Sequence, residues 1–237
     1  MNLTWASVTD TGRVRDHNED SVWPVGSGSA GDPLIVAVAD GMGGAAGGEV
    51  ASSVGLETAL GVGGNPMIRV QAANLAVLDT AREQPRLTGM GTTMTLARLE
   101  DGRYEIAHVG DSRAYLLRAG ELSQLTRDHS FVADMVAEGR LTPEEAERHP
   151  YRSVLTRVVG IDPDLEVDRV TGDLKEGDVL LLCSDGLSGM MPDSDVATIL
   201  EAADDPGEAA GRLTAAANAA GGLDNITVVV VKVSGDA

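Results

Sequence analysis

The sequence predicts an α+β domain built in layers, with antiparallel sheets. Apolar runs of strand length come in groups joined by short turns, which is the pattern of β-hairpins. Helical stretches come in sets between these groups, whereas a parallel doubly wound sheet would alternate single strands with single helices. No low-complexity tract, repeat of fixed period or long Pro- or Ser-rich linker divides the 237 residues, so we expect one domain over residues 1–237.

The expected strands are runs rich in Val, Leu, Ile and Ala. They cover residues 34–39, 92–99, 104–109, 114–117, 122–125, 179–183 and 226–233. The second and third of these runs are joined through Asp101-Gly102, a pair that favours the tight turn of a hairpin. Ala119-Gly120-Glu121 joins the fourth and fifth runs in the same way.

The expected helices cover residues 48–60, 66–84, 130–138, 143–149, 193–203 and 206–220. The fourth has a clear start signal. Thr142 can cap it and Pro143 suits its first position, with two acidic residues behind.

Composition excludes several classes of function. A net charge of −19 repels nucleic acid, which needs clustered Lys and Arg, so no nucleic-acid partner is expected. No apolar run approaches the roughly 20 residues that span a bilayer, and no signal peptide is expected because no basic segment precedes an apolar stretch. The single cysteine, Cys183, lies in an apolar run and predicts a buried thiol in the cytoplasm rather than a disulfide or a nucleophile.

Four aspartates stand where an expected strand begins or ends. Asp40 and Asp185 each close an apolar run, Asp111 follows another, and Asp224 opens the last. In an antiparallel sheet the start of one strand lies beside the end of its neighbour, so all four can meet at one edge. A carboxylate beside a buried strand is costly unless it is paired, hydrogen-bonded or bound to metal. We therefore expect a metal site rather than four separate turns.

Oxygen ligands favour a hard cation, Mg²⁺ or Mn²⁺. Zinc is disfavoured because one Cys and four scattered His show no ligand spacing, and no stretch has the pattern of an EF-hand. The Gly-rich residues 41–48 lack the Lys-Ser/Thr ending of a phosphate loop. Their expected role is to let the backbone approach the ion, so that the Gly41 carbonyl binds it.

Upstream of these aspartates, Arg15 stands four residues before the adjacent acids Glu19 and Asp20. Alone, this spacing suggests a surface salt bridge. Beside a metal cluster, the Arg15 guanidinium offers two parallel donors to the oxygens of a phosphate.

Short motifs occur in one order along nearly the whole chain. They are Arg15-x-x-x-Glu19-Asp20, Ala39-Asp40-Gly41-Met42-Gly43-Gly44, Gly91-Thr92-Thr93, Val109-Gly110-Asp111-Ser112-Arg113, Cys183-Ser184-Asp185-Gly186-Leu187 and Asp224-Asn225-Ile226-Thr227. Each motif is weak singly, but together they resemble the metal-dependent protein phosphatases, the protein phosphatase 2C type of Ser/Thr phosphatase, in their bacterial form.

The resemblance implies a four-layer α-β-β-α sandwich of two antiparallel sheets, with a site for two Mn²⁺ or Mg²⁺ ions and a third ion at one end. Asp40 would bridge the two ions, Asp185 and Asp224 would complete the first, and Gly41 would serve the second. The reaction implied is attack on phosphoserine or phosphothreonine by a hydroxide that bridges the ions, which lower the pKa of its parent water.

The remaining roles are also implied by the resemblance. Arg15 would hold the substrate phosphate, and Glu19 and Asp20 would act largely through bound waters. Asp111, with Asp185, would hold the third ion. Residues 131–160 would form a flap beside the site, and the Ser153 of that flap would contact the third ion.

Two positions depart from the family pattern. Eukaryotic members of the family carry a histidine, proposed to protonate the leaving alcohol, where this chain and many bacterial relatives have Met42. Many of those bacterial relatives have a histidine instead at the position of Ala45. A metal-bound water is the expected replacement, ahead of His129 or His149, which nothing in the sequence places near the site. General acid catalysis typically raises the rate ~10²–10⁴-fold, so the absence of both histidines can lower the rate by no more than that factor.

The resemblance also implies the partners, which are phosphorylated Ser/Thr proteins, including protein kinases. Two alternatives stay open on the sequence: a non-catalytic member of the fold that binds phosphoproteins or metal as a regulator, and a phosphatase of small molecules.

Overall fold

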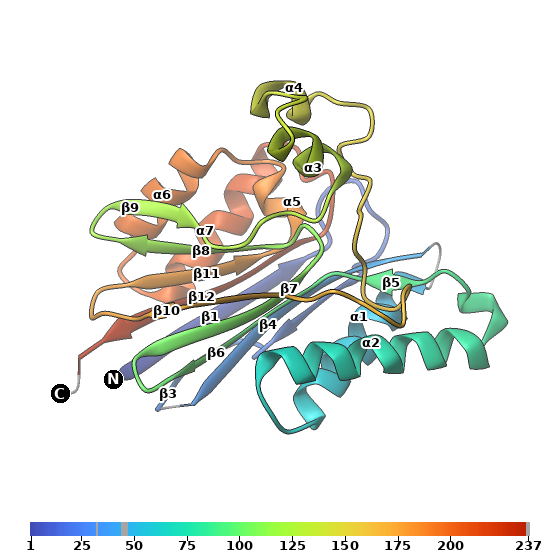
Figure 1. Ribbon diagram of the computed structural model, residues 1–237. Helices are drawn as coiled ribbons and strands as arrows, with labels where there is room; N and C mark the ends of the chain where they lie inside the picture. Colours follow the sequence, from blue (N-terminus) through green and yellow to red (C-terminus); the bar gives the residue numbers. More distant parts are fainter. Residues whose placement is uncertain (32, 44–46, 236–237) are drawn as a thin grey trace.

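The computed structural model describes residues 1–31, 33–43 and 47–235, and two antiparallel sheets stacked face to face form its centre (Figure 1). The first sheet has the order β3 (Ser27–Ala30), β1 (Asn2–Asp10), β12 (Ile226–Ser234), β11 (Val179–Cys183), β8 (Arg113–Arg118) and β9 (Glu121–Gln124). The second has the order β10 (Asp168–Asp173), β7 (Arg103–Val109), β6 (Met94–Glu100), β4 (Leu34–Met42) and β2 (Asp20–Trp23), with β5 (Gly91–Thr92) pairing to β4.

Helices cover the outer face of each sheet. The pair α1 (Gly47–Gly61) and α2 (Pro66–Glu83) packs on the second sheet, and a short 3₁₀ turn follows at Pro85–Leu87. The first sheet is covered by α6 (Asp193–Ala202) and α7 (Pro206–Ala219), with the short α5 (Asp185–Ser188) beside them. The predicted four-layer α+β sandwich is therefore confirmed.

The strand β4 shows why its sequence is apolar without alternation. Val36 and Val38 point into the core between the sheets, while Ala37 and Ala39 point into the core beneath α1 and α2. All four are fully buried. A strand that is covered on both faces has a continuous run of apolar residues, a pattern usually found in buried parallel strands. The small alanines let α1 approach the sheet.

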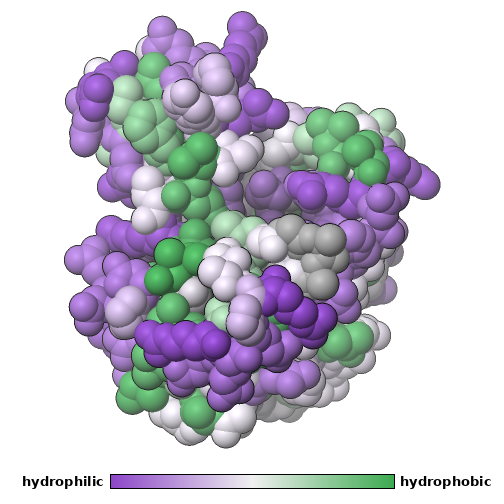
Figure 2. Space-filling model, turned by 90° about the vertical axis from the view of Figure 1, so that its right-hand side faces the viewer, coloured by the Kyte–Doolittle hydropathy of each residue, from purple (hydrophilic) through white to green (hydrophobic). Residues whose placement is uncertain are grey.

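A flap stands above one end of the sandwich (Figure 1). It contains α3 (Phe131–Ala137), capped by Ser130, and α4 (Pro143–Glu147), whose predicted cap at Thr142 forms a full capping box with Glu145. A bridge between Ser130 and Leu155 closes its base, and a bridge between Thr92 and Val159 joins it to β5. Figure 2 shows the flap as a lobe above the body, with apolar surface along the waist below it.

Four strands were not predicted. β3 and β10 are polar edge strands, β2 is short, and β1 mixes polar with apolar residues along its length. The predicted strand at residues 92–99 is interrupted at Thr93, and the helix expected to reach His149 ends at Glu147.

The remaining local predictions hold. Positive φ at both Asp101 and Gly102 gives the expected tight hairpin turn. Among the helices in the described ranges, none combines the length and apolarity that crossing a membrane requires.

Candidate active site

The predicted aspartates meet at the edge of the sandwich below the flap. Asp40 lies inside the end of β4, three residues of which extend beyond the predicted strand, and it pairs across the ladder with Asp20 at the start of β2. Asp185 begins α5 directly after β11, and Asp224 precedes β12. Asp111 lies between β7 and β8. Both sheets therefore contribute acids to a common edge, as the strand-end argument predicted.

Burial and mutual repulsion act on these acids together. Burial, followed by the charge of Asp20 and the other acids, raises the pKa of Asp40 well above its usual range. Burial likewise raises the pKa of Asp20 and of Asp111 to about 7, and that of Asp185 to about 6. A cluster of this kind ionises fully only when cations compensate its charge.

Three carboxylate oxygens in this cluster are buried and have no hydrogen-bond partner in the described part of the chain. They are Glu19 Oε1, Asp20 Oδ1 and Asp185 Oδ1. Unpaired buried carboxylate oxygens are costly, and a divalent cation with oxygen ligands satisfies them, so the residues present fit Mn²⁺ or Mg²⁺. Within the described ranges no three such side chains form a metal cage by themselves, so waters and backbone oxygens would have to complete the coordination.

Glycines bring the backbone close to these acids. A Cβ at Gly41 would lie 2.6 Å from the carbonyl oxygen of Glu19, and a Cβ at Gly48 would lie 2.7 Å from Glu19 Oε1. The Gly41 N–H donates to the Glu19 carbonyl at 3.2 Å. Gly41 and Gly48 thus pack the Glu19 segment against the end of β4. The predicted binding of an ion by the Gly41 carbonyl stays a prediction.

Polar neighbours hold the acids in place, and sequence reasoning assigned these neighbours no role. The Thr93 N–H donates to the Asp40 carbonyl at 2.8 Å, and the Asp40 N–H donates to Thr93 Oγ1 at 2.9 Å. Ser184 Oγ donates to Asp20 Oδ2 at 2.8 Å and accepts from the Thr227 N–H at 3.0 Å. These residues belong to the quoted motifs, and their place beside each aspartate was the only available signal.

Asn225 ties the N-terminal segment to the same edge. Its Oδ1 accepts from the Glu19 N–H at 2.8 Å, and its Nδ2 donates to the carbonyls of Thr11 and His17, each at 3.0 Å. The loop that carries Arg15 is thereby held beside Asp224. Arg15 Nη2 donates to Asp224 Oδ2 at 2.6 Å, with half of the Arg15 side chain exposed.

Comparison with known proteins decides the family. The family model for protein phosphatase 2C matches residues 13–214. The chain belongs to the protein phosphatase 2C family. The serine/threonine protein phosphatase PstP of Mycobacterium tuberculosis is 43% identical over 242 residues, which cover 98% of this chain. The serine/threonine phosphatase stp of Listeria welshimeri is 37% identical over 237 residues, which cover 94% of this chain and 93% of that protein.

The likeness to protein phosphatase 2C members extends to three dimensions. A crystal structure of the catalytic domain of PstP in complex with two manganese ions matches with a TM-score of 0.86 and 40% identity, over 99% of each chain. The chain spans about half the length of PstP itself, 45% of it. The described residues thus share the fold of protein phosphatase 2C members, as the motifs predicted.

The two histidines named as possible substitutes contact residues other than the aspartates of the candidate site. His129 is buried, where its Nδ1 accepts from the Gly110 N–H at 3.2 Å and its Nε2 lies 3.3 Å from Asp168. His149 packs in the flap against the rings of Phe131 and Tyr151. Among the predicted candidates for the leaving-group proton, neither histidine is therefore placed at the site.

Four other residues bear on the leaving-group proton or on the third ion. His17, which sequence reasoning did not consider, has its Nε2 3.9 Å from Glu19 Oε1. Met42 is half-buried at the end of β4, while Ala45 falls outside the described residues. Ser153 is exposed on the flap and lines the same groove as Asp111 and Asp185.

Proposed function

We propose that this chain hydrolyses phosphoserine and phosphothreonine in proteins, with residues 1–237 acting as one metal-dependent phosphatase domain. The observation that carries the proposal is the set of partnerless carboxylate oxygens on Glu19, Asp20 and Asp185. The Arg15 guanidinium lies near enough to Glu19 and Asp185 for their charges to raise its pKa, after the larger effect of its bond to Asp224. Cation sites beside a phosphate-binding guanidinium are what phosphate ester hydrolysis needs.

The ligand assignment follows the predicted set. Asp40, Asp185 and Asp224 would hold two Mn²⁺ or Mg²⁺ ions, with the Gly41 carbonyl as a further ligand. Asp111, with Asp185, would hold a third. When bound, the ions supply a water of lowered pKa as the nucleophile and neutralise charge on the phosphoryl oxygens.

The chain's own side chains position the reaction. Arg15 would bind two phosphoryl oxygens and orient the phosphorus for in-line attack. Glu19 and Asp20 would accept hydrogen bonds from waters on the ions, and the Ser184 hydroxyl fixes Asp20 for that role by its bond to Oδ2. Ser153 is proposed to face the third ion from the flap.

The proposed substrates are proteins phosphorylated on Ser or Thr, with protein kinases among them, because the relatives described above are named serine/threonine phosphatases. A cytoplasmic setting is part of the same proposal. It is supported by the single thiol, Cys183, which is fully buried in β11.

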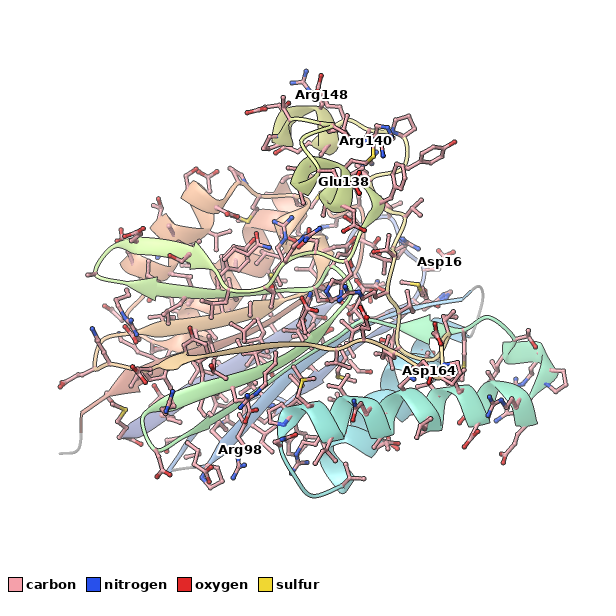
Figure 3. The ribbon with its side chains drawn as sticks, viewed as in Figure 1. Asp16, Arg98, Glu138, Arg140, Arg148 and Asp164 are labelled. Atoms are coloured by element: carbon pink, nitrogen blue, oxygen red, sulfur yellow. The ribbon has the colours of Figure 1, made fainter. Side chains whose placement is uncertain are left out.

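Turnover of p-nitrophenyl phosphate and of a phosphothreonine peptide, each with Mn²⁺ in excess, tests the proposal. We expect hydrolysis of both, and a loss of more than about 10³-fold in Asp40→Asn, since one bridging ligand serves both ions. Asp164→Asn is the matched control, because Asp164 is exposed on a loop beside α2, away from the site (Figure 3). Binding without hydrolysis would indicate a regulator, and hydrolysis of the aryl phosphate alone would indicate a small-molecule phosphatase.

A further inference from the structure

A groove of about 1100 Å³ separates the flap from α5 and the start of α6. Asp111 and Asp185 are among its lining residues, so the groove is continuous with the proposed metal site. The flap side of the groove includes Val136 and Ala137 of α3, and the opposite side includes Met190 and Met191. A groove of this size exceeds what one phosphate fills, and its apolar walls suit a length of polypeptide.

Two arginines of the flap line this groove without a partner. Arg148 and Arg152 are both exposed, and neither forms an ion pair or a side-chain hydrogen bond with another described residue. Figure 3 shows Arg148 at the top of the flap, at the end of α4. The chain has 37 acidic and 18 basic residues, so a cation left without a carboxylate is unexpected on its surface.

The other basic residues of the groove are already neutralised. Arg113 binds Asp128 at 2.8 Å, and Arg127 binds Asp134 at 2.7 Å. The flap arginines therefore carry the groove's available positive charge.

Two further acids line the groove, but neither forms an ion pair with a described arginine, so Arg148 and Arg152 remain open to the carboxylates of a ligand. Asp193 accepts a hydrogen bond from the Tyr115 hydroxyl at 3.1 Å, and Glu147 precedes Arg148 on α4. The other two unpaired acids, Asp111 and Asp185, belong to the proposed metal site and would be neutralised by bound ions. Elsewhere the net charge of −19 repels acidic ligands, so any affinity for them must arise from a local site of this kind.

We propose that this groove binds the acidic segment beside the phosphorylated residue of a protein substrate. Carboxylates of the segment would pair with Arg148 and Arg152, while its apolar side chains pack between α3 and Met190-Met191. This inference rests on the proposed phosphatase function and adds the class of sequence that the enzyme selects. Two observations identify an acidic peptide segment as the ligand of the groove. The unpaired arginines complement its charge, and the groove is continuous with Asp111 and Asp185.

The expected size of the preference follows from the exposure of the two arginines. An exposed ion pair contributes no more than a few-fold in affinity, so two pairs give about a tenfold preference at low ionic strength. Salt shortens the screening length to about 3 Å at 1 M, and the preference should disappear there.

The test compares phosphothreonine peptides that carry three Glu or three Ala residues on the N-terminal side, and a second pair with these residues on the C-terminal side. Wild-type enzyme should show a kcat/KM about tenfold higher for the acidic member of at least one pair. In Arg148→Gln/Arg152→Gln that ratio should fall to about one, with p-nitrophenyl phosphate turnover unchanged. The control Arg98→Gln/Arg140→Gln removes the same charge from two arginines that pair with Glu100 and Glu138 outside the groove, and should keep the wild-type ratio (Figure 3).

Binding of the same peptides with a non-hydrolysable difluoromethylene phosphonate in place of the phosphate separates this inference from the proposed function. Fluorescence anisotropy should show the tenfold preference and its loss in Arg148→Gln/Arg152→Gln, whether or not the enzyme turns over. Equal affinities of wild-type protein for acidic and neutral peptides would overturn the groove assignment. A preference that survives in Arg148→Gln/Arg152→Gln would overturn it too.

Discussion

Arg15 Nη2 donates a hydrogen bond of 2.6 Å to Asp224 Oδ2. The side chain proposed to bind phosphate is therefore bound to a proposed metal ligand. The two side chains are 50% and 35% exposed, and exposed pairs of this kind are worth about 0–1 kcal/mol. A divalent ion on Asp224 competes successfully with so weak a pair. Arg15 would then be free to bind phosphate once the metal is in place.

Replacing Arg15 should therefore harm catalysis without harming metal binding. Arg15→Ala removes charge-assisted hydrogen bonds to the phosphate, worth about 1.5–3 kcal/mol, so kcat/KM for p-nitrophenyl phosphate should fall about 10- to 100-fold. The Mn²⁺ affinity, measured by calorimetric titration, should be unchanged or slightly higher. Arg13→Ala is the control, because Arg13 has no bond to a site carboxylate, and an equal loss in both variants would contradict the assignment.

Asp40→Asn should make the metal-free protein more stable while it removes the activity. Burial and neighbouring acids raise the pKa of Asp40, and a carboxyl with a raised pKa costs folding stability as pH rises above its unfolded value. Removing about 1 kcal/mol of this cost should raise the melting temperature at pH 8 by about 2–4 °C in a domain of this size. Thermal melts in EDTA and in Mn²⁺ check both parts.

Added Mn²⁺ should raise the melting temperature of wild-type protein much more than that of Asp40→Asn. Asp164→Asn should behave as wild type in both conditions. A metal-free Asp40→Asn protein less stable than wild type would show that the Asp40 carboxylate stabilises the fold, contrary to the prediction.

The fold was predictable where burial leaves a strong pattern. β4 and β11 are covered on both faces, so their apolar runs were visible without structural information. The edge strand β10 is held by its ladder to β7, with Asp168 opposite His108, and its own residues are largely polar. Pairing with a neighbour decides such a strand, and local sequence does not record that pairing.

In the candidate site, too, some features were predictable from local sequence and others depend on contacts between distant segments. Asp40, Asp185, Asp111 and Asp224 were identifiable because a carboxylate at the end of a buried strand is unusual. The hydrogen bond from Arg15 to Asp224 spans 209 positions and depends on how the N-terminal loop is held by Asn225. No sequence spacing encodes a contact of that kind. Sequence analysis therefore proposed Asp224 as a metal ligand but missed that Arg15 would compete with the ion for it.

Acidification should destabilise the protein through His108. This fully buried side chain donates from Nε2 to the Arg127 carbonyl at 3.1 Å and has Thr95 Oγ1 2.9 Å from its Nδ1. Burial, with His129 beside it, lowers the pKa of His108 to about 4. The neutral ring is thus favoured by folding, and its contribution is present above pH 6.5 and is lost as pH falls toward 4.

The difference between wild type and His108→Gln isolates this effect, because the site carboxylates titrate alike in both proteins. Between pH 7.5 and 5.0, wild-type protein without metal should lose about 2 kcal/mol more unfolding free energy than the variant. Urea unfolding at the two pH values measures this directly. Equal losses would mean that His108 keeps an ordinary pKa in the fold.

The leaving-group proton gives a final prediction, because Met42, at the end of β4, carries no proton to donate. An aryl phosphate leaves without much protonation, whereas a serine alkoxide needs a proton, so turnover of phosphoserine peptides should be slow relative to p-nitrophenyl phosphate. Met42→His should raise the phosphoserine rate selectively by about tenfold or more, within the ~10²–10⁴ that general acid catalysis supplies. Steady-state rates on both substrates give the ratio. A selective loss of phosphoserine turnover in His17→Asn would contradict the expectation, since it would show that His17, beside Glu19, already donates the proton.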